Sequence, residues 1–169
     1  MEPIVTERLL LRPARMEDYP AHRAMELAPD FGLGPTTEHE SWHRFQRMAG
    51  NWALQGYGMF MAFDRQTQEF LGNVGLSDFR RGIEGIDGYP EAAWVFTAAA
   101  HGHGFATEGA IAAHDWLDAH VSPRRTVCII SPDNARSLRV AAKLGYRSFG
   151  EGCHLGDTVV LLERVAMAG

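Results

Sequence analysis

The stretch from Glu91 to Trp116 (EAAWVFTAAAHGHGFATEGAIAAHDW) constrains the fold most, because it predicts a strand, a glycine loop and a helix in direct succession. Gly102 and Gly104 lie in the loop, just before the helix. A helix start leaves backbone N–H groups without partners, and the helix dipole adds partial positive charge there. Glycines also let the backbone approach a ligand closely. The stretch therefore predicts a phosphate site, although glycines also occur in plain connections between a strand and a helix.

One face of this predicted helix carries almost no bulk. Small residues recur there at helical spacing, at Ala106, Gly109, Ala110 and Ala113. We expect this face to lie very close to a sheet.

The other elements alternate along the chain. Strands are predicted at Thr6–Arg12, Met59–Phe63, Phe70–Leu76, Thr126–Ile130, Tyr146–Gly150 and Thr158–Arg164. Helices are predicted from Asp18 or Tyr19, after a capping box at Thr37–Glu40, and from Asp133 or Asn134 to Gly145. Loops are predicted around Gly32, Gly34 and Pro35 and, as a flexible segment, at Arg80–Tyr89. The order predicts an α/β (mixed α+β) fold in which helices flank a mixed sheet.

Composition limits the classes of function. The 169 residues suit one domain, 1–169, with 46% apolar and 22% charged residues. A net charge of −5 argues against a nucleic-acid-binding surface and favours an amine-bearing substrate. No basic leader and no long apolar run is apparent, so we expect a cytoplasmic protein without a membrane segment. Cys128 and Cys153 form neither a disulfide framework nor a metal motif.

Four motifs in order resemble the GCN5-related N-acetyltransferases (GNAT), closest to the branch that contains the ribosomal-protein N-terminal alanine acetyltransferases. They are TERLLLR at 6–12, GNVGL at 72–76, the stretch 91–108, and NARS with KLGY at 134–137 and 143–146. Together they span nearly the whole chain. The resemblance implies a mostly antiparallel twisted sheet flanked by helices, and acetyl-CoA (coenzyme A) as cofactor.

The resemblance also implies which residues hold acetyl-CoA. The pyrophosphate would lie on the loop and first helical turn, at His101, Gly102, His103, Gly104, Phe105, Ala106 and Thr107. The pantetheine arm would pair with the strand at Val95, Phe96 and Thr97, and contact Asn134 and Ser137. Asn134 is equally well explained as a helix N-cap. His101 departs from the glutamine or arginine that usually opens this loop, which bears on affinity more than on the amide contacts.

Acetyl transfer to an amine needs a base for the amine and an acid for the leaving thiolate. Glu91 matches a glutamate of this branch and is the first candidate for the base, with pairing to an arginine as its structural alternative; His43 is the second candidate. Ala141 stands where many relatives have tyrosine; the candidate acid is Ser137, which matches a serine of this branch, with a helix residue of no catalytic role as its structural alternative. His101 and His103 lack a third ligand with suitable spacing, so no metal is expected.

These residues predict an acetyl-CoA-dependent N-acetyltransferase in which a primary amine, on a peptide N-terminus or a small molecule, attacks the thioester directly. The alternative is a non-catalytic acyl-CoA-binding or regulatory domain of the same fold, which His101 and Ala141 would favour. Use of another acyl chain also stays open. Neither nucleic acid nor membrane is expected as a partner, and a homodimer is compatible with the sequence.

Overall fold

The computed structural model describes residues 1–31 and 36–166. Its strands are β1 (Ile4–Val5), β2 (Leu9–Arg12), β3 (Met59–Asp64), β4 (Phe70–Ser77), β5 (Glu91–Phe96), β6 (Arg125–Ile130), β7 (Arg147–His154) and β8 (Asp157–Val165). Its α-helices are α1 (Tyr19–Glu26), α2 (Glu38–Gln55), α3 (Phe105–His120) and α4 (Ala135–Lys143). Of the loop expected around Gly32, Gly34 and Pro35, these three residues lie outside the described ranges.

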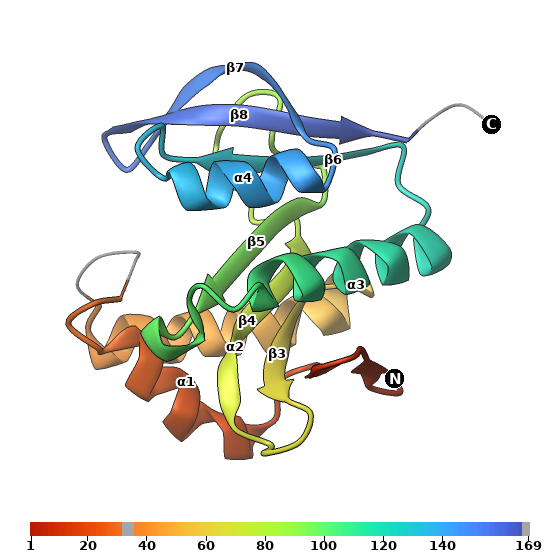
Figure 1. Cartoon of the computed structure of the whole chain (residues 1–169). Helices are drawn as coiled ribbons and strands as arrows, with labels where there is room; N and C mark the ends of the chain where they lie inside the picture. Colours follow the sequence, from red (N-terminus) through yellow and green to blue (C-terminus); the bar gives the residue numbers. More distant parts are fainter. Residues whose placement is uncertain (32–35, 167–169) are drawn as a thin grey trace.

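The strands form one eight-stranded sheet in the order β1-β2-β3-β4-β5-β6-β8-β7. Every neighbouring pair is antiparallel except β5 and β6, which run parallel. Helices α3 and α4 lie in front of the sheet and α1 and α2 lie behind it (Figure 1). The mixed, mostly antiparallel sheet with flanking helices confirms the predicted fold class.

The sheet opens in its middle. β5 pairs with β4 along its whole length, from Glu91 opposite Ser77 to Phe96 opposite Gly72. Its register with β6 is a single pair, Glu91 with Val127, supported by the Val127 amide donating to the Pro90 carbonyl at 3.0 Å. Beyond Glu91 the edge of β5 that faces β6 has no strand partner in the described part of the chain. The two strands therefore diverge from Glu91 onward.

The small face of α3 packs closely on the sheet, as expected. Ala110 and Ala113 are buried, and a Cβ built on Gly109 would lie 3.0 Å from Val74 Cγ1 and 3.3 Å from Leu9 Cδ1. At this spacing a larger side chain would push the helix away from β2 and β4. The main core is thus built between α3 and the strands it crosses.

Helix α2 begins where its capping box predicts. The Thr37 hydroxyl accepts a hydrogen bond from the Glu40 amide at 3.2 Å, and the Glu40 carboxylate accepts one from the Thr37 amide at 2.8 Å. Gly56 ends the helix with φ +76, a conformation that glycine adopts without strain. Phe45 and Met48 turn inward onto β3. The apolar stripe of α2 is therefore mainly core packing.

The strand predicted at Thr6–Arg12 is wrong at its first residues. Thr6 to Arg8 form a turn between β1 and β2, closed by the Thr6 amide donating to the Leu9 carbonyl at 2.9 Å. The carboxylate of Glu108 holds this turn by accepting hydrogen bonds from the Thr6 hydroxyl at 2.6 Å and the Arg8 amide at 2.9 Å. A contact between residues 100 positions apart thus overrides the local strand pattern.

The loop at Arg80–Tyr89 forms no helix or strand, but it is anchored to the sheet. Ile83 and Ile86 are buried against β6 and β8. The Asp87 carboxylate accepts hydrogen bonds from the Arg81 amide at 2.9 Å and the Gly82 amide at 2.8 Å. The loop therefore has a defined shape beside the start of β5.

None of the helices within residues 1–31 and 36–166 combines the length and the apolarity that a membrane crossing requires.

Candidate functional site

The loop between β5 and α3 presents unpartnered amides to solvent. Gly102 and Gly104 both have φ +82, and residues 101–104 are exposed. Gly104 is the N-cap of α3 but contributes no side chain, and the first amide to find an intrahelical acceptor is that of Glu108, 3.1 Å from the Gly104 carbonyl. By contrast, the Asn134 side chain caps α4. Helix α3 therefore begins with its amides and its positive dipole end available to an anion.

Arg8 and Glu108 hold this helix start in place. The Arg8 guanidinium binds the Glu108 carboxylate through Nε at 2.7 Å, donates from Nη1 to the His103 carbonyl at 2.8 Å, and lies 4.7 Å from the centre of the Phe105 ring. Burial raises the pKa of Glu108, but the hydrogen bonds from Thr6 and Arg8 outweigh it and lower that pKa below its ordinary value. The loop is thus fixed from the side of the β1–β2 turn.

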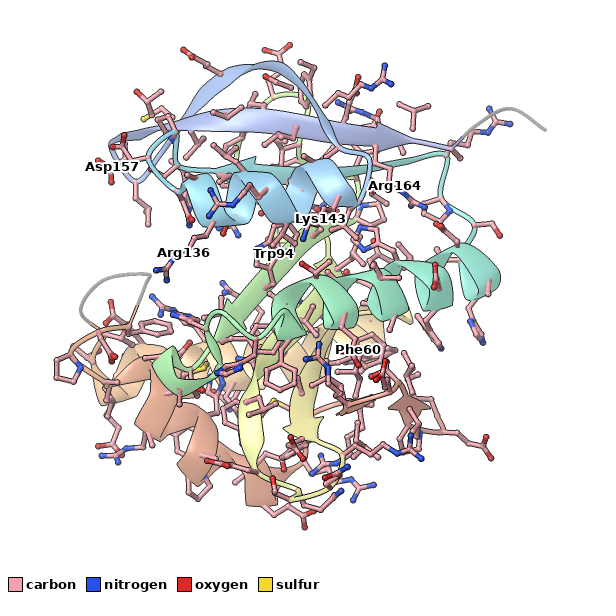
Figure 2. All side chains as sticks on the ribbon, viewed as in Figure 1. Phe60, Trp94, Arg136, Lys143, Asp157 and Arg164 are labelled. Carbon is pink, nitrogen blue, oxygen red and sulfur yellow. The ribbon has the colours of Figure 1, made fainter. Side chains whose placement is uncertain are left out.

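A cavity of about 420 Å³ lies beside this first turn. Gly104 and Thr107 line it from α3, Arg8 lines it from the β1–β2 turn, and Lys143 lines it from the end of α4. Lys143 is the only lysine in the chain. Figure 2 shows Lys143 and Arg136 on α4, the helix that faces α3 across the opening of the sheet. Lys143 was missed by sequence reasoning as a site residue, because its placement depends on how α4 docks.

The two histidines of the loop point to different partners. His101 Nε2 lies 3.1 Å from the Phe96 carbonyl oxygen, which ties the loop to the end of β5. The His103 ring lies 6.0 Å from the Phe105 ring. A second cavity, of about 410 Å³, lies nearby between α1 and the end of β5, where Phe96, Thr97 and Ala98 line it.

Trp94 crosses the opening between the diverging strands. Its indole N–H on β5 donates to the Ser137 hydroxyl on α4 at 3.2 Å, and Figure 2 shows the ring beneath α4. The Ser137 amide in turn donates to Asn134 Oδ1 at 3.0 Å. Two residues predicted from sequence are therefore neighbours on α4. The tryptophan that joins them to β5 carried no signal in the sequence.

Glu91 lies at the point where β5 and β6 part. It is 2% exposed, and its carboxylate oxygens are 2.8 and 2.9 Å from Arg81 Nε. Burial raises the pKa of Glu91, and the hydrogen bond and charge of Arg81 oppose that shift. Arg81 Nη1 also lies 3.0 Å from His154 Nε2. The arginine partner considered for Glu91 is thus present, from a loop rather than from a neighbouring strand.

His43, the second candidate base, contacts another histidine of its own helix. It is exposed on α2, with its Nε2 3.0 Å from Nε2 of His39 one turn earlier. Tyr146 is buried behind α4, where its hydroxyl lies 2.8 Å from both His114 Nε2 and Thr126 Oγ1. Cys128 is buried, and burial raises the pKa of its thiol, so it is unsuited to act as a nucleophile.

The chain matches the family model described as "Acetyltransferase (GNAT) domain" over residues 8–147. Among solved structures it is similar to a protein described as a GnaT-family acetyltransferase from Bordetella pertussis, with 33% identity, TM-score 0.91, and 98% of this chain and 100% of that chain covered. An acetyltransferase from Agrobacterium tumefaciens is 25% identical with TM-score 0.84, covering 98% and 95% of the two chains.

RimL, a ribosomal L7/L12 alpha-N-protein acetyltransferase solved in complex with coenzyme A, shares the fold with TM-score 0.77 and 19% identity, over 99% of this chain and 100% of that chain. A search of curated proteins found no match. A family match over residues 8–147 and a 33% identical structure covering nearly the whole chain agree with the geometry of the site. The protein therefore belongs to the GNAT family of acetyltransferases.

Proposed function

We propose that this single-domain acetyltransferase uses acetyl-CoA to acetylate a primary amine, on a peptide N-terminus or a small molecule. The observation that carries the proposal is the free edge of β5. That edge runs from the exposed amides at the start of α3 to the buried carboxylate of Glu91. A ligand with a diphosphate at one end and an extended amide-containing arm fits both features.

The residues present fit the diphosphate of coenzyme A. Gly102 has open space in front of it, with no atom within 4 Å of a built Cβ, and the only neighbour of such an atom on Gly104 is Arg8 Nη2 at 3.5 Å. The amides of Phe105, Ala106 and Thr107 would bind phosphate oxygens, and Lys143 adds a positive charge to the same cavity. His101 and His103 flank these amides.

The arm of the coenzyme would pair with the free edge of β5 at Val95, Phe96 and Thr97, in the manner of an added strand. Asn134 uses its Oδ1 to cap α4, so its Nδ2 remains available to donate to an amide carbonyl of the arm. When bound, acetyl-CoA supplies an acetyl group activated as a thioester. A backbone N–H on the free edge of β5 would stabilise negative charge on the thioester oxygen.

Glu91 is suited to accept the proton of the amine, directly or through water. A carboxylate whose pKa is raised by burial binds a proton more strongly than an ordinary glutamate, which makes it the better base near neutral pH. Arg81 opposes the rise in the pKa of Glu91 and fixes the orientation of its carboxylate. Ser137 accepts a hydrogen bond from Trp94, so its own hydroxyl hydrogen remains free to be donated to a leaving thiolate.

The alternative, an acyl-CoA-binding domain without turnover, has one observation in its favour. Both oxygens of Glu91 already lie within 2.9 Å of Arg81 Nε, which weakens them as proton acceptors.

Calorimetry with coenzyme A and a thiol-release assay with acetyl-CoA separate the two functions. The assay would use a panel of neutral, acidic and basic primary amines. We expect coenzyme A to bind and free thiol to appear with at least one amine. Binding without thiol release for any amine would support the alternative, and absence of binding would overturn both.

A further inference from the structure

Three arginines gather on the α2 side of the sheet, and one of them, Arg81, contacts Glu91. Arg44 and Arg47 come from α2, and Arg81 comes from the loop that precedes β5. Arg47 and Arg81 share one aromatic platform, because their guanidinium carbons lie 5.8 and 4.8 Å from the centre of the Phe79 ring. We call Arg44, Arg47 and Arg81 the arginine cluster. Its position beside Glu91 places it where an acceptor would meet the proposed base.

Two members of the arginine cluster have carboxylate partners. Arg44 Nη1 lies 3.6 Å from Glu26 Oε1, and Arg81 Nε lies 2.8 Å from Glu91 Oε2. Burial raises the pKa of both glutamates, so their negative charge is held less firmly than usual. Burial and the charge of Arg81 lower the pKa of His154, which favours the neutral form of its ring.

Arg47 differs from its neighbours. Within residues 1–31 and 36–166, no carboxylate lies within ion-pair distance of its guanidinium and no side-chain acceptor is hydrogen-bonded to it; its described contact is the Phe79 ring. Burial lowers the pKa of Arg47, and the charges of Arg81 and Arg44 lower it further, while the charges of Glu26 and Glu91 oppose this shift. Because neither Glu26 nor Glu91 reaches ion-pair distance, a further anion placed against the Arg47 guanidinium would stabilise its charge. The Arg47 side chain remains exposed to solvent, so an anion from outside the chain can reach it.

We propose that Arg47, with Arg81 beside it, binds a carboxylate of the acceptor, so that the enzyme prefers an amine carried by an acidic molecule. The acceptor preference rests on the proposed acetyl transfer. The net charge of −5 by itself favours a basic acceptor, whereas the arginine cluster favours an acidic one at this place on the surface. A planar guanidinium fork matches a carboxylate in two parallel hydrogen bonds, which orients as well as attracts the acceptor.

The test compares acceptors that differ only in charge. Alanyl peptides with aspartate, asparagine or lysine as second residue, all C-terminally amidated, would be assayed with wild-type protein, Arg47→Gln and Arg47→Glu; free aspartate would show whether a single amino acid suffices. We expect kcat/KM of the wild type to be roughly tenfold higher for the aspartyl than for the asparaginyl peptide. Arg47→Gln should bring this ratio close to one, because it lowers kcat/KM for the aspartyl peptide more than for the asparaginyl peptide, and Arg47→Glu should favour the lysyl peptide.

The matched control is Arg124→Gln. Arg124 is also exposed and without a described side-chain partner, but it lies between α3 and β6. This variant should retain the wild-type ratio. No preference in the wild type, or an unchanged ratio in Arg47→Gln, would overturn the inference. Urea unfolding of each variant would show whether a lost ratio reflects lost folding.

A binding measurement separates this inference from the proposed function. The aspartyl peptide would be titrated into wild-type and Arg47→Gln protein by calorimetry, with and without coenzyme A. Weaker binding to the variant, together with no turnover of any acceptor, would keep the carboxylate site and reject the transferase. Turnover without charge preference would do the reverse.

Discussion

The indole N–H of Trp94 donates a hydrogen bond to the Ser137 hydroxyl at 3.2 Å, and so joins β5 to α4 across the divergence of β5 and β6. The bond fixes the hydroxyl through its oxygen and leaves its hydrogen free. It also places a large ring between the two halves of the sheet. Trp94 is therefore a positioning residue for Ser137.

Ser137→Ala should lower kcat roughly tenfold, because the leaving thiolate loses its proton donor, at the low end of general acid catalysis. The defect should shrink with an aryl thioester, whose thiol has a lower pKa and leaves without protonation. Trp94→Phe should cause part of the same defect, and the double variant should be no slower than Ser137→Ala alone. Equal defects with both thioesters would exclude Ser137 as the acid.

Gly104→Ala should weaken coenzyme A binding at least tenfold and destabilise the protein by about 1–2 kcal/mol, since φ +82 disfavours a residue with a Cβ. Gly145→Ala is the matched control. Gly145 has φ +86 and equally open space, but it lies past the end of α4. Calorimetry and urea unfolding should show equal destabilisation in both variants and weaker binding only in Gly104→Ala.

Glu91→Gln should reduce kcat about 100-fold and abolish the acidic limb of the pH–rate profile. Because burial raises the pKa of Glu91, we expect the wild-type limb to lie above the ordinary glutamate value of 4.5. The control is Glu163→Gln, which removes a carboxylate paired with Arg125 at 2.7 Å, two strands across the sheet from Glu91. Rates would be measured from pH 5 to 9. An acidic limb that survives in Glu91→Gln would exclude Glu91 as the base.

Glu108→Gln should lower the free energy of unfolding at pH 7 by about 1–2 kcal/mol, because the Glu108 carboxylate accepts from Thr6 and Arg8. The folded-state pKa of Glu108 lies below its ordinary value of 4.5, so its stabilisation is present above that pH and is lost as pH falls through the folded-state pKa. The stability difference between wild type and Glu108→Gln in urea should therefore shrink at low pH. A constant difference would mean that Glu108 acts by packing.

Coenzyme A should protect Lys143 from an amine-reactive reagent. Lys143 is the only lysine, so mass spectrometry of the modified protein reports it against the N-terminal amine as an internal control. Lys143→Gln should weaken coenzyme A binding roughly threefold, as expected for one exposed charge. Undiminished labelling at saturating coenzyme A would place Lys143 outside the binding site.

Local patterns predicted most of the fold correctly. The capping box of Thr37 and Glu40, the small face of α3 and the strand at Thr126–Ile130 each depend on residues a few positions apart, and each is confirmed. The strand at Thr6–Arg12 was wrong at its start because its shape depends on Glu108, 100 residues away. Local propensity carries no information about such a partner.

In the candidate site, too, the residues set by local patterns could be predicted and those set by long-range contacts could not. The residues of the α3 start could be predicted, because a glycine loop before a helix is a local signal. The partners that set the chemistry could not. Arg81 reaches Glu91 only because the loop folds back over β6 and β8, and Trp94 meets Ser137 only because α4 docks over β5. No periodicity or residue spacing in the sequence indicates either contact.

Because β5 and β6 share a single register pair, residues of β5 beyond it are not needed to hold the two strands together. Past Glu91, the backbone of β5 is secured by β4 alone, so side chains facing the gap hold neither strand in register. Substitutions there should leave folding intact while changing which molecules react. An enzyme built on this sheet can acquire new acceptors by changing side chains that face this gap, with little loss of thermodynamic stability.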